Sequence, residues 1–216
     1  EFQQIGEFTD SLTIQKRLRG VWQHHQNVSY CFFGSKKHLM ENIFQSRRMP
    51  FYQFGEMLHL KYIPTEYWVP FICSRFEKYG KKITKEYAGR ICQVVKNYSS
   101  YVQQLAWNVM AETGKEVNEE SFEEGLKALL EQNSSLFIQQ TEGLTTYQLN
   151  FIRLLCKGIH SGFTTQTVSE IYPLGSKSNI DRIKKSLADK EIVTIEKDGI
   201  FLADSVFELW FKKEMM

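Results

Sequence analysis

A helical repeat of apolar side chains, beginning at Thr65, limits most strongly what this chain can fold into. Up to residue 143, apolar residues recur about every 3.6 positions in successive segments, with breaks near Gly80, Gly114 and Asn118. A helix with this repeat has one apolar face, which must pack against other helices. The segment 65–143 is therefore predicted to form a small four-helix bundle.

Helix-start signals agree with this repeat. Thr84 and Asn118 have side chains of the kind that cap helix N-termini, and Glu119 and Glu120 follow Asn118. The positive end of the helix dipole stabilises carboxylates in the first turn. Helices are therefore expected to begin just after Thr84 and just after Asn118.

The first part of the chain, residues 1–64, has a different pattern. A predicted helix over 11–24 is followed by a nearly continuous apolar run at 27–35, a helical repeat around 36–46 and a second strand-like run at 55–63. Continuous apolar runs are typical of strands covered on both faces of a parallel sheet. The order predicts one edge of a doubly wound α/β layer, and so few strands indicate only part of such a domain.

The last section, 144–216, carries the clearest local signals. Thr145 and Gln148 have the spacing of a capping box, and further helices are predicted near 164–172 and over 178–189. Alternating apolar residues around Asp198-Gly199 predict a β-hairpin, after which a last helix is expected. Three helices followed by a hairpin is the order of a winged helix-turn-helix, so the whole chain is predicted to be mainly α.

Composition excludes several classes of protein. The 216 residues include 27 Lys and Arg against 25 Asp and Glu, so the net charge of +2 favours neither nucleic acid nor membrane surfaces. The apolar stretches are shorter than the roughly 20 residues of a membrane span, and a cytoplasmic protein with no membrane partner is expected. The four cysteines lie far apart, which predicts reduced, buried thiols and no metal site: Cys31, Cys73, Cys92 and Cys156.

Several motifs occur in an order known from one family. They are Glu-Phe-Gln at residues 1–3, an apolar run ending in Phe-Phe-Gly-Ser, the helical segment, and a final section ending in Phe-Glu-Leu-Trp-Phe. This order resembles the archaeal and bacterial P-loop ATPases of the AAA+/STAND group. The resemblance implies the end of an ATPase α/β core at 1–64, a helical lid at 65–143 and a winged helix at 144–216. It also implies a C-terminal fragment that begins inside the Walker B motif.

The resemblance also implies roles for two residues. Glu1 matches the Walker B glutamate, which polarises the water that attacks the γ-phosphate, and Ser35 matches the sensor 1 position. An alternative interpretation of Gly34-Ser35 is that it only ends a strand and caps the next helix. Both interpretations of Ser35 remain open at the level of the sequence.

The phosphate-binding loop G-x-x-x-x-G-K-[ST] does not occur in the 216 residues. Its backbone amides, lysine and hydroxyl hold the phosphates and Mg²⁺ in P-loop enzymes. ATP and Mg²⁺ are therefore expected for an intact protein, whereas this chain alone is expected to bind neither and to show no ATP turnover. Whether the chain counts as an enzyme is left open, and no nucleotide-binding residue is assigned.

Three functions remain, and the third is a purely structural interaction domain. The favoured one is a regulatory or remodelling ATPase, whose lid and winged helix respond to nucleotide and contact a protein partner or the protein's own upstream ATPase domain. The alternative is a winged-helix DNA-binding module with a vestigial ATPase part. The last section of the chain, 144–216, has ten Lys and Arg against nine Asp and Glu, a weak footprint for DNA. The candidate nucleic-acid contacts are Lys177, Asn179, Arg182, Lys184 and Lys185.

Overall fold

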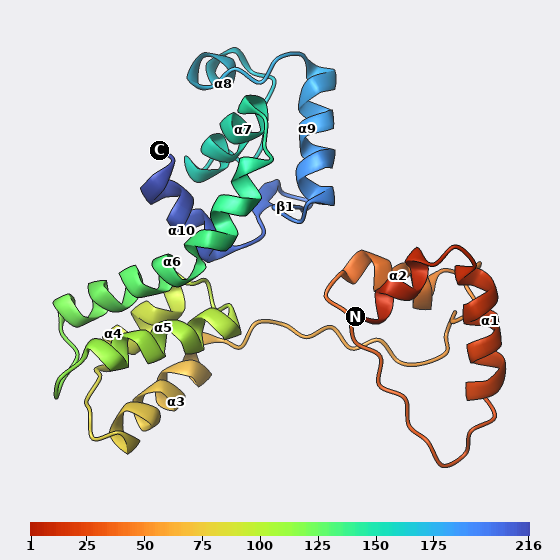
Figure 1. The fold of residues 1–216 in the computed structure, drawn as a ribbon, viewed down its shortest axis with the longest axis horizontal. Helices are drawn as coiled ribbons and strands as arrows, with labels where there is room; N and C mark the ends of the chain where they lie inside the picture. Colours follow the sequence, from red (N-terminus) through yellow and green to blue (C-terminus); the bar gives the residue numbers. More distant parts are fainter. The chain divides into compact units, whose positions relative to one another are not determined.

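The computed structural model describes the backbone of residues 1–216 and all side chains except those at positions 166, 167 and 169. Helices dominate the chain (Figure 1), and the sheet that the described backbone contains is a two-stranded hairpin. The chain divides into two compact units, residues 1–61 and residues 62–216. Each unit is described by itself. Among the described residues, no helix is both long enough and apolar enough to cross a membrane.

The first unit is built around an aromatic core. Its elements are a short 3-10 helix and two α-helices: η1 (Phe2–Glu7), α1 (Ser11–Trp22) and α2 (Lys37–Gln45). The ring of Phe2 lies 4.5 Å from that of Phe32 and 5.7 Å from that of Phe44, measured between centroids. The buried residues of this core are Ile5, Met40, Ile43, Phe44 and Phe51.

The two strands predicted in this unit, at 27–35 and 55–63, do not form, so the prediction of an α/β layer is wrong for the described chain. Both segments are irregular and lack a ladder partner, although the Phe2 amide donates to the Phe33 carbonyl at 2.9 Å. A strand requires a neighbour with matching backbone groups, and none lies beside these segments in the described chain. The predicted covering of both faces is also wrong, because Phe33 is 72% exposed and Leu60 89%.

The prediction of buried cysteines is correct for two of the four positions. Cys92 and Cys156 are buried, Cys73 is half-buried, and Cys31 is exposed, which contradicts the prediction. Cys31 lies in the irregular segment that has no covering layer. Burial raises the pKa of the Cys92 thiol to about 11 and that of Cys156 to about 12, so both thiols are protonated at neutral pH.

The second unit begins with helices at the positions predicted from the apolar repeat. They are α3 (Thr65–Lys78), α4 (Lys85–Val94), α5 (Ser99–Glu112) and α6 (Glu119–Glu142). Figure 1 shows α5 and α6 side by side, and their contact is the largest between elements of the chain. Gly125 permits this approach, because a Cβ atom there would lie 2.6 Å from the Val109 backbone nitrogen.

Both predicted helix caps are confirmed. Thr84 Oγ1 accepts from the Tyr87 amide at 3.3 Å, and Asn118 Oδ1 accepts from the Ser121 amide at 2.9 Å. Ser121 Oγ in turn accepts from the Asn118 amide at 3.1 Å, which completes a capping box. The capping box at the start of the next helix is confirmed too, since Thr145 and Gln148 form both of its bonds.

The last section adds four helices and the hairpin. Their bounds are α7 (Thr146–Cys156), α8 (Gln166–Ile171), α9 (Lys177–Asp189), β1 (Val193–Ile195), β2 (Ile200–Leu202) and α10 (Ser205–Glu214). The strands pair antiparallel, with Ile195 opposite Ile200. Because the Glu196 amide donates to the Gly199 carbonyl at 2.8 Å, Lys197 and Asp198 form the tip of the turn.

Specific polar contacts attach α10 to the helices before it. Ser205 Oγ donates to the Val95 carbonyl at 2.9 Å, and the Tyr101 hydroxyl donates to Asp204 Oδ2 at 2.5 Å. Trp210 Nε1 donates to Ser134 Oγ at 3.1 Å. Residues 62–216 therefore form one compact unit, and the predicted division into segments 65–143 and 144–216 stays a prediction about domains.

Candidate functional site

Glu1 and Ser35, the two residues with predicted catalytic roles, are neighbours in the first unit. Ser35 Oγ donates to Glu1 Oε2 at 3.0 Å, and the Ser35 backbone amide donates to the same oxygen at 3.4 Å. Gln3 Nε2 also donates to Glu1 Oε2 and lies 3.5 Å from Ser35 Oγ. These three residues are called the Glu1–Gln3–Ser35 cluster below.

Phe2 positions this cluster. Its amide is bonded to the Phe33 carbonyl, and its ring packs among the aromatic side chains of the core, 5.5 Å from the ring of Phe51. The residues on either side of Phe2 are thereby held next to Gly34 and Ser35. The packing of Phe2, which lies between Glu1 and Gln3, therefore brings Glu1 next to Ser35, 34 positions away in the sequence.

The cluster favours an ionised carboxylate. Hydrogen bonds from Gln3, then from the Ser35 hydroxyl and the Ser35 amide, lower the pKa of Glu1 below its usual value. Each of these donors is stabilised by a negative charge on the acceptor. An ionised, hydrogen-bonded carboxylate can accept a proton or orient a water molecule. A serine hydroxyl beside it can turn its one proton from the carboxylate to another anion.

The capping interpretation of Ser35 is not supported. The N-cap residue of α2 is Lys36, and no side chain makes a cap hydrogen bond there. The Ser35 hydroxyl instead donates to Glu1. The role of Ser35 as sensor 1 stays a prediction, and the structure brings it into contact with Glu1.

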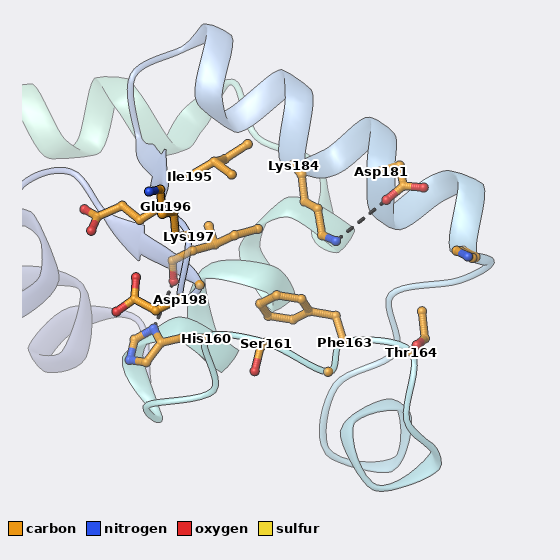
Figure 2. Close-up of a pocket in the computed structure, with 14 residues that line it drawn as sticks. His160, Ser161, Phe163, Thr164, Asp181, Lys184, Ile195, Glu196, Lys197 and Asp198 are labelled. Atoms are coloured by element: carbon orange, nitrogen blue, oxygen red, sulfur yellow. Dashed lines mark hydrogen bonds and ion pairs between the residues drawn. The ribbon is translucent and has the colours of Figure 1, made fainter. Parts of the chain in front are cut away.

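The second unit contains a groove of about 460 Å³ between α9, the segment 160–164 and the hairpin (Figure 2). Lys177, Asp181 and Lys184 line it from α9. Lys184 Nζ lies 3.6 Å from Asp181 Oδ1 and 5.3 Å from the centroid of the Phe163 ring. The opposite side is the hairpin turn, whose Glu196, Lys197 and Asp198 also line the groove.

The predicted nucleic-acid contacts separate into three groups. Lys177 and Lys184 line the groove, whereas Arg182 and Lys185 are exposed on α9 outside its lining. Asn179 is used within the chain, because its Nδ2 donates to the Leu174 carbonyl at 2.7 Å. The groove therefore takes in only two of these five residues.

The charges of the groove are balanced. Its lysines are Lys177, Lys184 and Lys197, and its carboxylates are Asp181, Glu196 and Asp198. The polyanionic backbone of DNA requires a clear excess of positive charge. The groove consequently gives little support to nucleic-acid binding.

His160, which has no predicted role, contacts the hairpin. His160 Nδ1 lies 2.9 Å from the Ile200 carbonyl, and its ring stacks on Phe201 at 4.5 Å. Gly199 allows this contact, since a Cβ atom there would lie 2.9 Å from the His160 carbonyl oxygen. No helical or strand repeat marks such a long-range contact. Within the residues described, no group of three or more His, Cys, Asp or Glu side chains could hold a metal ion.

Comparison with known proteins finds similarity in the fold of the chain. No family model matches the sequence, and no curated protein matches it significantly. Among solved structures, the Walker-type ATPase PABY2304 of Pyrococcus abyssi matches 97% of this chain with a TM-score of 0.71 and 12% sequence identity.

The match shows that the fold of this chain is similar to that of a Walker-type ATPase. The chain spans 61% of the length of that structure. The likeness supports the P-loop ATPase-like fold that the sequence resemblance implied. At 12% identity it shows the fold alone, so the activity of this chain has to be argued from its own residues.

Proposed function

We propose that this chain works as part of a P-loop ATPase of the AAA+/STAND type, with the Glu1–Gln3–Ser35 cluster at the water-activating end of the ATP site. The observation that carries the proposal is the 3.0 Å contact between Ser35 Oγ and Glu1 Oε2. The motif resemblance assigned these residues to Walker B and sensor 1, two positions expected at one site. The fold similarity to a Walker-type ATPase supports an ATPase-like fold for the chain that carries these residues.

In this proposal each residue has a separate task. The ionised Glu1 carboxylate accepts a hydrogen bond from the attacking water and orients it. The single hydroxyl proton of Ser35 is donated to Glu1 without nucleotide and to a phosphate oxygen with nucleotide bound, so the hydrogen bond of Ser35 reports whether the nucleotide is present. ATP with Mg²⁺ supplies the phosphoryl group when it is bound.

Glu1 and Ser35 fit only the water-activating end of an ATP site. A carboxylate and a hydroxyl suit an attacking water, but a triphosphate also needs backbone amides and a lysine around it. The 216 residues contain no G-x-x-x-x-G-K-[ST] pattern, so a segment outside them would have to hold the phosphates. The chain by itself is expected to show no ATP turnover.

The second unit is proposed to be the responding part. In this interpretation α3–α6 form the lid and α7–α10 with the hairpin form the winged helix. The bonds from Ser205 to Val95 and from Tyr101 to Asp204 support joint movement of the two parts. A change at the nucleotide would then alter a surface that contacts a protein partner or the ATPase core in the cytoplasm.

Mutation of the cluster tests this function. In the protein with a phosphate-binding loop present, Glu1→Gln is expected to lower kcat for Mg²⁺-ATP hydrolysis about 100-fold or more. Ser35→Ala is expected to lower it about tenfold, through the loss of one donor. Ser29→Ala, an exposed serine of the same irregular segment, is the matched control.

Two results would overturn the proposal. One is an unchanged hydrolysis rate in the Glu1→Gln protein. The other is a coding sequence that places an in-frame start codon at Glu1 with no phosphate-binding loop ahead of it. A Mg²⁺-dependent ATPase rate from the 216 residues alone would contradict the expectation that they are inactive.

The second candidate is a winged-helix DNA-binding module. Its support is the position of Lys177 and Lys184 at a groove beside the hairpin, and its weakness is the equal number of carboxylates there. Binding of a labelled duplex is expected to be undetectable at low salt. Binding that weakens steeply as salt rises, and that is lost in Lys177→Ala/Lys184→Ala, would favour this candidate instead.

A further inference from the structure

Gln3 is the buried member of the Glu1–Gln3–Ser35 cluster, and the proposed function gives it no task of its own. Its side chain is 3% exposed. Its Nε2 is bonded to Glu1 and near Ser35, whereas its Oε1 has no hydrogen-bond partner among the described residues. Burial of an amide with one unsatisfied oxygen costs free energy, so an apolar side chain of similar size would serve better if Gln3 only filled space.

Gly34 makes room for this amide. A Cβ atom at Gly34 would lie 2.0 Å from Gln3 Oε1 and 2.8 Å from Met40 Sδ. Gly34 does not have a positive φ, so its backbone conformation does not demand glycine. The close approach of Gln3 is therefore what requires glycine here.

A backbone hydrogen bond of the neighbouring residue, Phe2, also restrains the position of Gln3. The bond between the Phe2 amide and the Phe33 carbonyl ties the start of η1 to the segment that carries Gly34 and Ser35. The Gln3 side chain is thus enclosed between these segments, with Nε2 directed at the Glu1 carboxylate. Exposed Glu1 has no such enclosure of its own.

We propose that Gln3 is a positioning residue, whose buried amide holds the Glu1 carboxylate in its contact with the Ser35 hydroxyl. A carboxylate on an exposed, freely rotating side chain would sample many orientations, and fixing one of them favours the orientation of a reacting water. The catalytic consequence rests on the proposed function. The positioning itself does not.

The hydrogen bonds at Glu1 support this role. The Gln3 bond is the largest of the contributions that lower the pKa of the Glu1 carboxyl, ahead of both bonds from Ser35. Removal of this donor should therefore raise the pKa of Glu1. A side chain that only filled space would leave that pKa unchanged when replaced by one of similar volume.

The test is a pH titration of the Glu1 carboxyl by NMR in the 216-residue chain. Gln3→Met keeps the length of the side chain and removes the amide, and the pKa of Glu1 is expected to rise. Gln4→Met is the matched control, because Gln4 is exposed on the same η1 helix, and it should leave Glu1 unchanged. A Glu1 pKa that stays the same in folded Gln3→Met protein overturns the proposal.

A second variant keeps the proposal falsifiable if Gln3→Met does not fold. Gly34→Ala retains the Gln3 side chain, but the added Cβ atom forces the Gln3 amide away from Glu1. The pKa of Glu1 should therefore again rise. An unchanged pKa of Glu1 in Gly34→Ala, with the fold intact, contradicts the proposal as directly as the first variant would.

An activity measurement separates this proposal from the proposed function. In the ATP-hydrolysing protein with its phosphate-binding loop, Gln3→Met is expected to lower kcat about tenfold with KM for ATP unchanged, and to have no further effect in a Glu1→Gln background. If Glu1→Gln has no effect on hydrolysis, the proposed function fails while the titration still decides the role of Gln3. If Gln3→Met lowers kcat equally in both backgrounds, Gln3 does not act through Glu1.

Discussion

Glu208 on α10 shows how a single charged residue joins separate parts of the second unit. Its carboxylate is bonded to Lys96 Nζ and Lys212 Nζ, each at 2.6 Å, and its side chain is 16% exposed. Burial acts to raise the pKa of Glu208, but the bonds from Lys212 and Lys96 outweigh it, so the pKa lies below its ordinary value. The ionised form is therefore more stable in the folded than in the unfolded chain.

This sign predicts sensitivity to acid. The stabilisation is present above the pKa of an unfolded glutamate and is lost as pH falls through the lower pKa of folded Glu208. Glu208→Gln is expected to reduce the free energy of unfolding by about 1 kcal/mol at pH 7 and by much less at pH 3. Urea denaturation at both pH values measures this, with Glu214→Gln, an exposed glutamate of the same helix, as control. An equal loss at the two pH values would show that the charge of Glu208 is not the cause.

At the scale of the element, local signals were the easiest to predict from the sequence. The caps at Thr84, Asn118 and Thr145 each depend on residues within three positions, and all three form. The prediction of strands at 27–35 and 55–63 was wrong because a strand requires a partner strand, which the apolar run itself does not reveal. Their apolar character is visible in the sequence, but the pairing of their backbone is not.

The candidate site follows the same rule. Glu1 and Ser35 were identified because the order of the sequence motifs resembles that of a known ATPase family. Gln3 was missed because a buried amide leaves no periodic signal, although Gly34 marks the place it approaches. On α9, residue type alone suggested nucleic-acid contacts, whereas the fold directs Asn179 towards Leu174 and pairs Lys184 with Asp181.

The cap of α6 gives a prediction at this scale. Asn118→Ala removes the acceptor for the Ser121 amide and is expected to destabilise the second unit by about 1 kcal/mol. Asn118→Ser is the control, because a serine hydroxyl can accept the same bond and should retain most of the stability. Denaturation by urea, followed by circular dichroism, compares the two. Equal stability of the Ala and Ser proteins would mean that the cap contributes nothing.

At the scale of the whole molecule, the two units differ in how much core they contain. The buried core of the second unit is continuous from Trp68 on α3 to Phe211 on α10, whereas the first unit has a separate and much smaller buried cluster. Small cores stabilise a fold weakly, since less of the surface is buried. The two units are joined through the segment around Leu58 and Leu60, whose side chains are 82% and 89% exposed.

Residues 62–216 are therefore expected to fold by themselves, and the whole chain is expected to unfold in two steps, with the first unit at the lower temperature. Hydrogen exchange measured by mass spectrometry during a thermal series resolves the steps by segment. Trp22→Ala should lower only the first transition, because Trp22 packs on Phe32 at 5.4 Å, and Trp210→Ala should lower only the second. A single transition that both substitutions lower would mean that the units stabilise one another. A chain of residues 62–216 that remains unfolded would lead to the same conclusion, because its core would then depend on residues 1–61.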